Sequence, residues 1–270
     1  MRSVFVDGVL DCLIDNNIDI LNVFGISASS KDMIYYPTHQ KLFAYKANIN
    51  SINDEKMYNM SNLLLGKPVF NMEHYKEFRD KNYPYKIEEI RDSDFNLYIG
   101  ASNTRTCEIE YFDKYTSSLD DAILASCSIP VLFQEVNINE HYYLDGGLCE
   151  NIPFMTAIKK GFDKVIVVAT REKGYRDIKP ENDPKDLFVK LKFQNNPNLL
   201  SKILNVSSNY NSEMDLLDKL EDEGKIFVLR PNTTKDFDRF EKDNNKLSQL
   251  YNDGYNTCLR NLEHLLTYLK

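Results

Sequence analysis

The feature that most constrains the fold is an uninterrupted apolar run, VIVVA, at residues 165–169. Apolar and polar residues do not alternate in this run, which is typical of a strand covered on both faces of its sheet. The run is also far shorter than the roughly 20 apolar residues that a membrane-spanning helix needs. It therefore predicts a buried strand in a sheet that has helices on both sides.

Strand and helix patterns alternate along most of the chain. Apolar residues recur at helical spacing from Val4 to Ile14, the sequence DNN ends this helix, and a short apolar strand follows at 20–25. Further strands are predicted at 95–102, 107–112, 163–171 and 225–231, a hairpin at 135–147, and helices at 118–127, 153–161, 184–192 and 200–222. This alternation predicts an α/β fold, a three-layer sandwich with a mainly parallel central sheet.

The chain has the length of one large α/β domain. A single sheet can bury a full core in a chain of 270 residues, and no low-complexity tract or linker divides the sequence. We therefore expect one domain over residues 1–270. Within it, the polar and aromatic-rich residues 39–90 are predicted as short helices and loops that cover one side. Leucines at three- and four-residue spacing predict a C-terminal helix at 244–269.

Charge and cysteine content exclude several classes of function. A net charge of −8 disfavours nucleic acid as a partner, because phosphate binding depends on lysine and arginine. The five cysteines are widely spread, with no C-x-x-C pair, so we expect reduced thiols and no metal site. Acidic residues interrupt the apolar N-terminal stretch, unlike the core of a signal peptide. These features predict a cytoplasmic protein.

The stretch GISAS, from Gly25 to Ser29, has the pattern of a catalytic serine turn with one departure. A nucleophilic serine needs a sharp turn from strand to helix, which Gly25 permits. The fifth position of the pattern is normally glycine and here is Ser29, which is also small. The alternative is that Ser27 caps a helix. The turn alone leaves both interpretations open.

A nucleophilic serine also needs a base. The chain has four histidines, but none lies in a loop signature that pairs it with an acid, so the sequence does not predict a Ser-His-Asp triad. Asp145 follows a strand and precedes Gly146 and Gly147, so it is a candidate carboxylate base. Its alternative is an ordinary Asp-Gly turn. Both Ser27 and Asp145 follow strands, at the edge where α/β sheets bind ligands.

Taken together, GISAS at 25–29 and DGG at 145–147 resemble the bacterial patatin-like serine acyl hydrolases, which carry a G-x-S-x-G turn and then a D-G-G or D-G-A turn. The stretches ASCSIP at 125–130 and LEDEGKIFVLRP at 220–231 are also similar to that family. The resemblance runs from residue 2 to the C-terminus. It implies a lipid acyl hydrolase, a phospholipase or carboxylesterase with a Ser-Asp dyad, no metal and no organic cofactor.

The resemblance also assigns roles to residues. Ser27 would attack the ester carbonyl, and Asp145 would accept its proton and later activate water on the acyl-enzyme. The family stabilises the oxyanion with a loop of pattern G-G-G-x-R-G. Arg2 matches the arginine of this loop, Ser3 replaces the glycine after it, and the earlier glycines have no match. The predicted oxyanion region is therefore Arg2, Ser3 and Ala28.

Two explanations of the unmatched glycines stay open. In the first, Met1 is an internal methionine of a longer protein. In the second, the protein is a weakened or inactive hydrolase that binds lipid or a protein partner. The substrate expected in the first case is a lipid or another ester.

The basic residues between 159 and 176 have two interpretations. They either form a solvated rim or attract an anionic membrane surface in a transient contact. The residues are Lys159, Lys160, Lys164, Arg171, Lys173 and Arg176.

Overall fold

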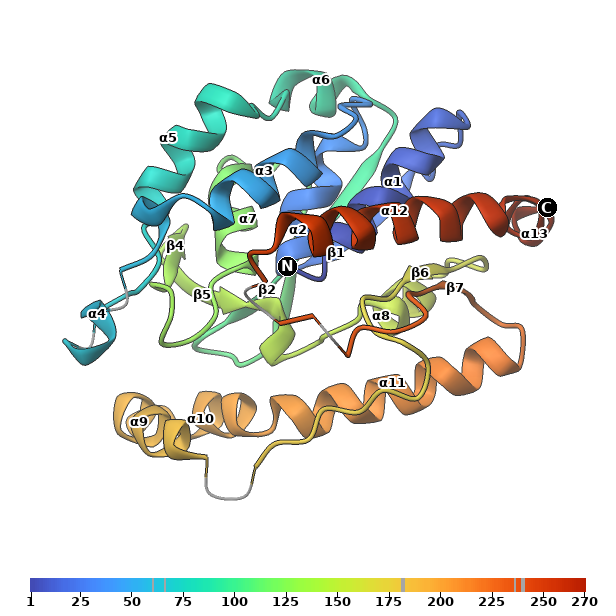
Figure 1. Ribbon diagram of the computed structural model, residues 1–270. Helices are drawn as coiled ribbons and strands as arrows, with labels where there is room; N and C mark the ends of the chain where they lie inside the picture. The colour runs from blue at the N-terminus through green and yellow to red at the C-terminus, as the bar shows by residue number, and fades with distance from the viewer. Residues whose placement is uncertain (60, 66, 181–182, 236, 239–240) are drawn as a thin grey trace.

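A central sheet with helices on both sides forms the fold of the computed structural model (Figure 1). The structure describes residues 1–59, 61–65, 67–180, 183–235, 237–238 and 241–270. The five-stranded sheet contains β1 (Asn22–Ile26), β2 (Asn96–Asn103), β3 (Ile109–Phe112), β4 (Val136–Ile138) and β5 (His141–Asp145). A two-stranded parallel sheet contains β6 (Ile166–Val168) and β7 (Phe227–Leu229).

Helices cover both faces of these sheets. One layer contains α1 (Val4–Asp15), α2 (Ala28–Asp32), α3 (Phe43–Ile52), α5 (Met72–Asn82), α6 (Ile87–Asp92), α7 (Leu119–Ser126), α12 (Asn244–Arg260) and α13 (Leu262–Leu269). The other contains α8 (Phe154–Lys159), α9 (Pro184–Phe193), α10 (Pro197–Leu204) and α11 (Val206–Asp222). The short α4 (Ser61–Leu64) lies at the edge. No helix in the described ranges is long and apolar enough to span a bilayer.

Alternating side chains of β1 divide the core between the two layers. Val23 packs into the clusters that α1, α7 and α12 form, whereas Phe24 belongs to the cluster of α8 and α11. Phe24 also stacks on Tyr98 of β2, with ring centroids 4.2 Å apart. This two-sided burial follows from the period of two along a strand. The predicted α/β fold, a central sheet between helical layers, is confirmed.

The strand directions are more mixed than the predicted mainly parallel sheet. The β1–β2 and β6–β7 pairs are parallel, whereas β2–β3, β2–β5 and β4–β5 are antiparallel. The physical reason is the length of the connections. Asn139 and Glu140 alone join β4 to β5, and so short a loop can join only antiparallel strands.

Two predicted helices are interrupted. The segment 200–222 divides at Asn205 into α10 and α11, and 244–269 divides at Asn261 into α12 and α13. Both asparagines leave helical geometry, with φ near −99°. The Asn261 side chain donates to the carbonyl of Thr257 at 2.8 Å, a local bond that competes with a continuous helix. Residues 39–90 contain α3, α4, α5 and α6.

Helices α1 and α12, from opposite ends of the chain, cross with their backbones in contact. A Cβ atom on Gly8 would lie 2.1 Å from the Tyr251 carbonyl oxygen, and one on Gly254 would lie 2.1 Å from that of Phe5. The crossing is therefore possible only with glycine at both positions. It buries Phe5 and its neighbours completely. A single domain over residues 1–270 stays a prediction.

This crossing predicts an unusual response to a glycine replacement. Inside a helix, Gly→Ala is normally stabilising by about 1 kcal/mol, but we expect Gly254→Ala to destabilise the fold by about 2 kcal/mol, because overpacking forces the helices apart. The exposed Asn256 of the same helix provides the control, since Asn256→Ala should be neutral or stabilising. Urea denaturation of the two variants tests this. Equal or raised stability of Gly254→Ala would contradict the described crossing.

Candidate active site

The pairing register of β2 brings Ser27 and Asp145 together. Ile26, the last residue of β1, pairs with Gly100, and Asp145, the last residue of β5, pairs with the next residue, Ala101. Ser27 follows Ile26 directly. Its Oγ donates a hydrogen bond of 2.6 Å to Oδ2 of Asp145. Two predicted site residues separated by 118 positions therefore meet at this end of the sheet.

The Ser27 backbone adopts a strained conformation at the turn between β1 and α2. Its φ of 56° and ψ of −131° lie outside the regions that a residue with a side chain normally occupies. Helix α2 returns at once towards the strand, so that a Cβ on Gly25 would lie 2.7 Å from Cα of Ser30. Ser27 precedes the helix, yet its side chain makes no capping bond. The turn has the geometry of a nucleophile elbow.

Ser29, which departs from the expected glycine, is bonded to the strand end. Its Oγ donates to the carbonyl of Ile26 at 2.8 Å and accepts from the Ile26 N–H at 3.0 Å. One small side chain thus satisfies both backbone groups of the residue before Ser27. The structure therefore accommodates this departure from the motif.

The C-terminal end of α7 fixes the Ser27 backbone. Ser126 Oγ accepts from the Ser27 N–H at 2.9 Å and donates to the Gly100 carbonyl at 2.6 Å. The Cys127 thiol donates to the Ser27 carbonyl at 3.0 Å. Burial raises the pKa of Cys127 to about 12, so the thiol stays a neutral donor. Sequence reasoning assigned no role to these residues, although they lie in the family-like stretch ASCSIP.

Hydrogen bonds also fix the backbone and the carboxylate of Asp145. The residue is 6% exposed, and its N–H donates to the Ser128 carbonyl at 2.9 Å. The Gly147 N–H donates to Oδ1 at 2.8 Å, while Oδ2 accepts from Ser27. Gly146 leaves room for the Gly100 carbonyl, which would lie 2.4 Å from a Cβ atom. Both glycines of the D-G-G turn therefore contribute to the placement of the carboxylate.

The four histidines lie elsewhere. His39 Nε2 is 2.9 Å from Asp19, and His74 Nε2 is 2.8 Å from Asp54. The remaining two, at 141 and 264, are exposed. The hydrogen-bond partner of Ser27 Oγ is a carboxylate, which is the arrangement of a Ser-Asp dyad.

The predicted oxyanion region lies at two helix starts. Ala28 begins α2, and the first N–H groups of a helix have no acceptor within it. Ser3 is buried where α1 begins. Burial raises the pKa of Tyr210 on α11 to about 12, and the charges of Arg171 and Arg2 oppose the rise. Oxyanion binding by these residues stays a prediction.

A buried polar cluster lies behind α2. Lys31 Nζ donates to Asp32 at 2.8 Å, and Asn48 Nδ2 donates to both Asp32 and Asp7, at 3.0 and 2.9 Å. Burial, and then the charge of Asp32, raise the pKa of Asp7 well above its ordinary value. Sequence reasoning missed this cluster. Its signal is an acidic residue within the apolar pattern of the first helix.

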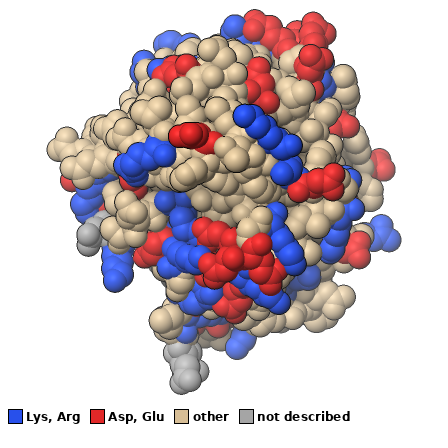
Figure 2. All heavy atoms as spheres, turned by 90° about the vertical axis from the view of Figure 1, so that its right-hand side faces the viewer, with Lys and Arg blue, Asp and Glu red and all other residues tan. Residues whose placement is uncertain are grey.

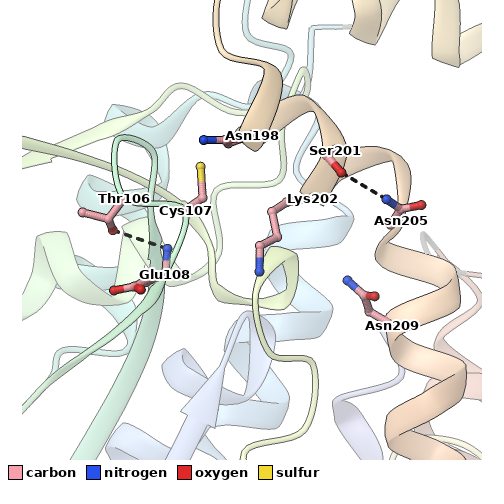
Figure 3. A pocket seen from close by; sticks show the side chains of 8 residues that line it. All are labelled: Thr106, Cys107, Glu108, Asn198, Ser201, Lys202, Asn205 and Asn209. Atoms are coloured by element: carbon pink, nitrogen blue, oxygen red, sulfur yellow. Dashed lines mark hydrogen bonds between the residues drawn. The ribbon is translucent and has the colours of Figure 1, made fainter.

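A polar pocket of about 520 Å³ lies away from Ser27. It opens between the turn that follows β2 and the helices α10 and α11 (Figure 3). Its lining residues are Thr106, Cys107, Glu108, Asn198, Ser201, Lys202, Asn205 and Asn209. The pocket is linked to the D-G-G region, because the Cys149 thiol donates to the Cys107 carbonyl at 3.2 Å.

Two of the basic residues between 159 and 176 are paired with acidic residues. Lys173 pairs with Glu221 at 3.2 Å, and Arg176 pairs with Asp218 at 3.1 Å. Figure 2 shows acidic side chains mixed with basic ones on the face that lies on the right of Figure 1. Acidic partners on α11 thus offset the charges of Lys173 and Arg176, which favours the interpretation of these two residues as part of a solvated rim.

The raised pKa of Asp7 predicts a pH dependence of stability. Because the folded protein holds this proton more tightly than the unfolded chain, the contribution of Asp7 to stability is lost as pH rises through the folded-state pKa. Each pH unit between the two pKa values costs about 1.4 kcal/mol. We expect Asp7→Asn to gain stability over the wild type as pH rises from acidic to neutral, measured by urea denaturation. The exposed Asp94→Asn serves as the control. A stability difference between Asp7→Asn and the wild type that stays constant across this range would contradict the prediction.

The strained turn predicts that Ser27→Gly is more stable than Ser27→Ala. Both variants lose the hydroxyl, but only glycine adopts a positive φ without steric cost. Glycine relieves about 1–3 kcal/mol of backbone strain at this position. This gain exceeds the loss of stability that glycine causes through the greater entropy of the unfolded chain. Thermal and urea denaturation of the two variants measure the difference. If Ser27→Ala is equally stable or more stable, the turn is not strained.

Two family models match the chain. Patatin-like phospholipase matches residues 8–158, which is more than half of the 270 residues. Domain of unknown function (DUF6363) matches residues 196–270. The first match contains both the serine turn and the D-G-G turn, and the second contains α12, which crosses α1.

The chain also resembles three known proteins. The "Uncharacterized protein YjjU" of Escherichia coli (strain K12) is 22% identical over 174 residues, covering 63% of this chain and 49% of that protein. The "Probable lipid hydrolase 463L" of Invertebrate iridescent virus 6 is 27% identical over 202 residues, covering 65% and 69%. VipD from Legionella pneumophila, a crystal structure, has a TM-score of 0.44 and 10% identity, covering 97% and 65%.

The chain thus spans about half the length of the Escherichia coli protein and about two thirds of the other two. The family match includes the two motifs on which the resemblance in the sequence depends, so that resemblance is confirmed. The chain belongs to the patatin-like phospholipase family.

Proposed function

We propose that this protein is a lipid acyl hydrolase, a phospholipase or carboxylesterase, with Ser27 as nucleophile and Asp145 as general base. The observation that carries the proposal is the hydrogen bond of 2.6 Å from Ser27 Oγ to a buried carboxylate at a strained turn. Strain of this kind is concentrated at functional sites. The family, and a relative named as a probable lipid hydrolase, support the lipid class of substrate.

Acylation uses the proton that the dyad already shares. Ser27 Oγ attacks the ester carbonyl carbon while Asp145 Oδ2 accepts the hydroxyl proton. The carbonyl π electrons move to oxygen and form a tetrahedral oxyanion. When this intermediate collapses, the bond to the alcohol portion breaks and the alcohol leaves with the proton from Asp145. The product is an acyl ester of Ser27.

Deacylation repeats the proton transfer with water. Asp145 accepts a proton from a water molecule as its oxygen attacks the acyl carbonyl, and collapse of the second tetrahedral intermediate releases the carboxylic acid. The proton returns from Asp145 to Ser27 Oγ. One water molecule is consumed for each ester bond cleaved.

The oxyanion would be stabilised by donors at the starts of α2 and α1. The Ala28 N–H, directly after the nucleophile, is the first candidate, and Arg2 and Ser3 at the start of α1 are the others. One such donor contributes about 3–4 kcal/mol to the transition state. Ser3 stands where the family carries glycine, and this residue favours the second candidate function, a weakened or silent member that binds lipid or a protein.

We also propose a cytoplasmic location with transient contact to a membrane surface. All five cysteines are free thiols, which supports a reducing compartment. The substrate class, a lipid, requires that the site reach a lipid surface.

The dyad is tested by replacement of its two members. We expect a fluorophosphonate probe to label the wild type but not Ser27→Ala. Asp145→Asn should reduce hydrolysis of a carboxylic ester by about 10²–10⁴-fold, the contribution of a general base. Its thermal stability should stay close to that of the wild type, because the amide oxygen can still accept from Gly147.

Histidine variants serve as controls. His39→Ala and His141→Ala should keep full activity, since neither residue bonds to Ser27. Loss of activity in one of them would refute the dyad, and so would full turnover of Asp145→Asn. A folded wild type that resists the probe and cleaves no ester would instead support the silent binding protein.

A further inference from the structure

Helix α9 carries apolar residues on two opposite sides. With 3.6 residues per turn, Val189 and Phe193 point to one side, where they pack into the cluster that contains Leu199. Leu187 and Leu191 point to the other side and are 66% and 60% exposed. A helix at the surface normally has one apolar and one polar face. We therefore expect the apolar outer side of α9 to bind another surface.

Neighbouring apolar residues extend this outer side. Phe188 is 37% exposed, and Ile178, in the segment before α9, is 87% exposed. An ion pair of 2.7 Å between Lys179 and Asp186 holds that segment against the helix. In Figure 1, α9 lies at the edge of the molecule, at one end of α11. We call Ile178, Leu187, Phe188 and Leu191 the outer apolar surface.

Lysines border the outer apolar surface. On the helical wheel, Lys190 lies on one side of Leu187 and Leu191. Lys192 lies on the other side, and its ammonium group is turned towards the inner side of the helix, 5.7 Å from the centroid of the Phe193 ring. Neither lysine forms an ion pair with another residue in the described ranges. The sequence of α9 contains three lysines and one aspartate, although the whole chain has a net charge of −8. Lys190 therefore places a positive charge beside the exposed leucines, in a chain that is negative overall.

We propose that α9 binds the surface of an anionic lipid bilayer, with the outer apolar surface inserted between the headgroups. Exposed apolar side chains between lysines are the pattern of helices that lie in the membrane interface. Lysine stems cover apolar surface while their ammonium groups reach anionic headgroups. The proposal rests on the proposed function, because a lipid bilayer is where the substrate of such a hydrolase lies. The proposal places the membrane contact on α9, a helix that contains neither Ser27 nor Asp145.

The test measures binding without catalysis. The full chain carrying Ser27→Ala is mixed with vesicles of phosphatidylcholine, with or without one third phosphatidylglycerol, and bound protein is separated by flotation. We expect binding to the anionic vesicles. Adding Leu187→Ser and Leu191→Ser should weaken it at least about tenfold, because two large apolar side chains no longer leave water. Adding Lys190→Gln and Lys192→Gln instead should remove the preference for phosphatidylglycerol.

A matched control distinguishes the effect of the outer apolar surface from the effect of replacing any two exposed leucines. Leu259 and Leu266, 47% and 42% exposed on other helices, are changed to serine together, and this variant should bind as the parent does. The inference is overturned if the parent does not bind anionic vesicles, or if the α9 variant binds as well as the control. A third outcome also overturns the inference: the parent forms dimers and does not bind vesicles, and the α9 leucine changes abolish the dimer. The outer apolar surface would then be an interface with a second copy of the chain.

The proposed function is tested separately. With Ser27 intact, the α9 leucine variant should still hydrolyse a water-soluble short-chain ester at the wild-type rate. Its rate on phosphatidylglycerol vesicles should fall at least about tenfold, in line with the loss of binding. A protein that binds vesicles but cleaves neither ester would refute the hydrolase and leave the membrane contact standing.

Discussion

The whole site depends on the pairing of three strands at consecutive residues of β2. Gly100 pairs with the last residue of β1, and Ala101 pairs with Asp145. Because pairing fixes which side chains are neighbours, the serine after β1 must lie beside the carboxylate that ends β5. A slip of one residue on either side would turn one partner to the other face of the sheet. The contact between Ser27 and Asp145 therefore depends on the register of the sheet more than on the loops.

The turn at Ser27 is unfavourable by itself and is held by hydrogen bonds from elsewhere. A residue in such a conformation costs about 1–3 kcal/mol, whereas each buried hydrogen bond contributes about 1 kcal/mol net. Ser126 and Cys127 each supply one bond to Ser27, and Ser29 supplies two to the preceding residue. These small polar side chains together offset the strain. The hydroxyl of Ser29, at the fifth motif position, therefore forms two hydrogen bonds that a glycine could not form.

The sequence predicted what local patterns determine. The strand–turn–helix at Gly25, the hairpin around Asn139 and the α/β architecture all follow from spacing within about ten residues. The bond between Ser126 and Ser27 spans 99 positions, and nothing in the local pattern indicates it. The interruption at Asn261 escaped prediction because the leucine spacing continues through it. Likewise, periodicity could not distinguish the exposed Leu187 from a core residue, because apolar residues on the outer and the inner side of α9 both recur at helical spacing.

The two ends of the chain depend on one another through the crossing of α1 and α12. Helix α1 begins at Val4, so the predicted oxyanion residues Arg2 and Ser3 are placed by the position of this helix. That position is fixed by the contact of Gly8 with the α12 backbone, which lies in the segment 196–270 matched by the second family model. The segment 196–270 thus fixes the position of α1 and, through it, the position of the predicted oxyanion residues Arg2 and Ser3.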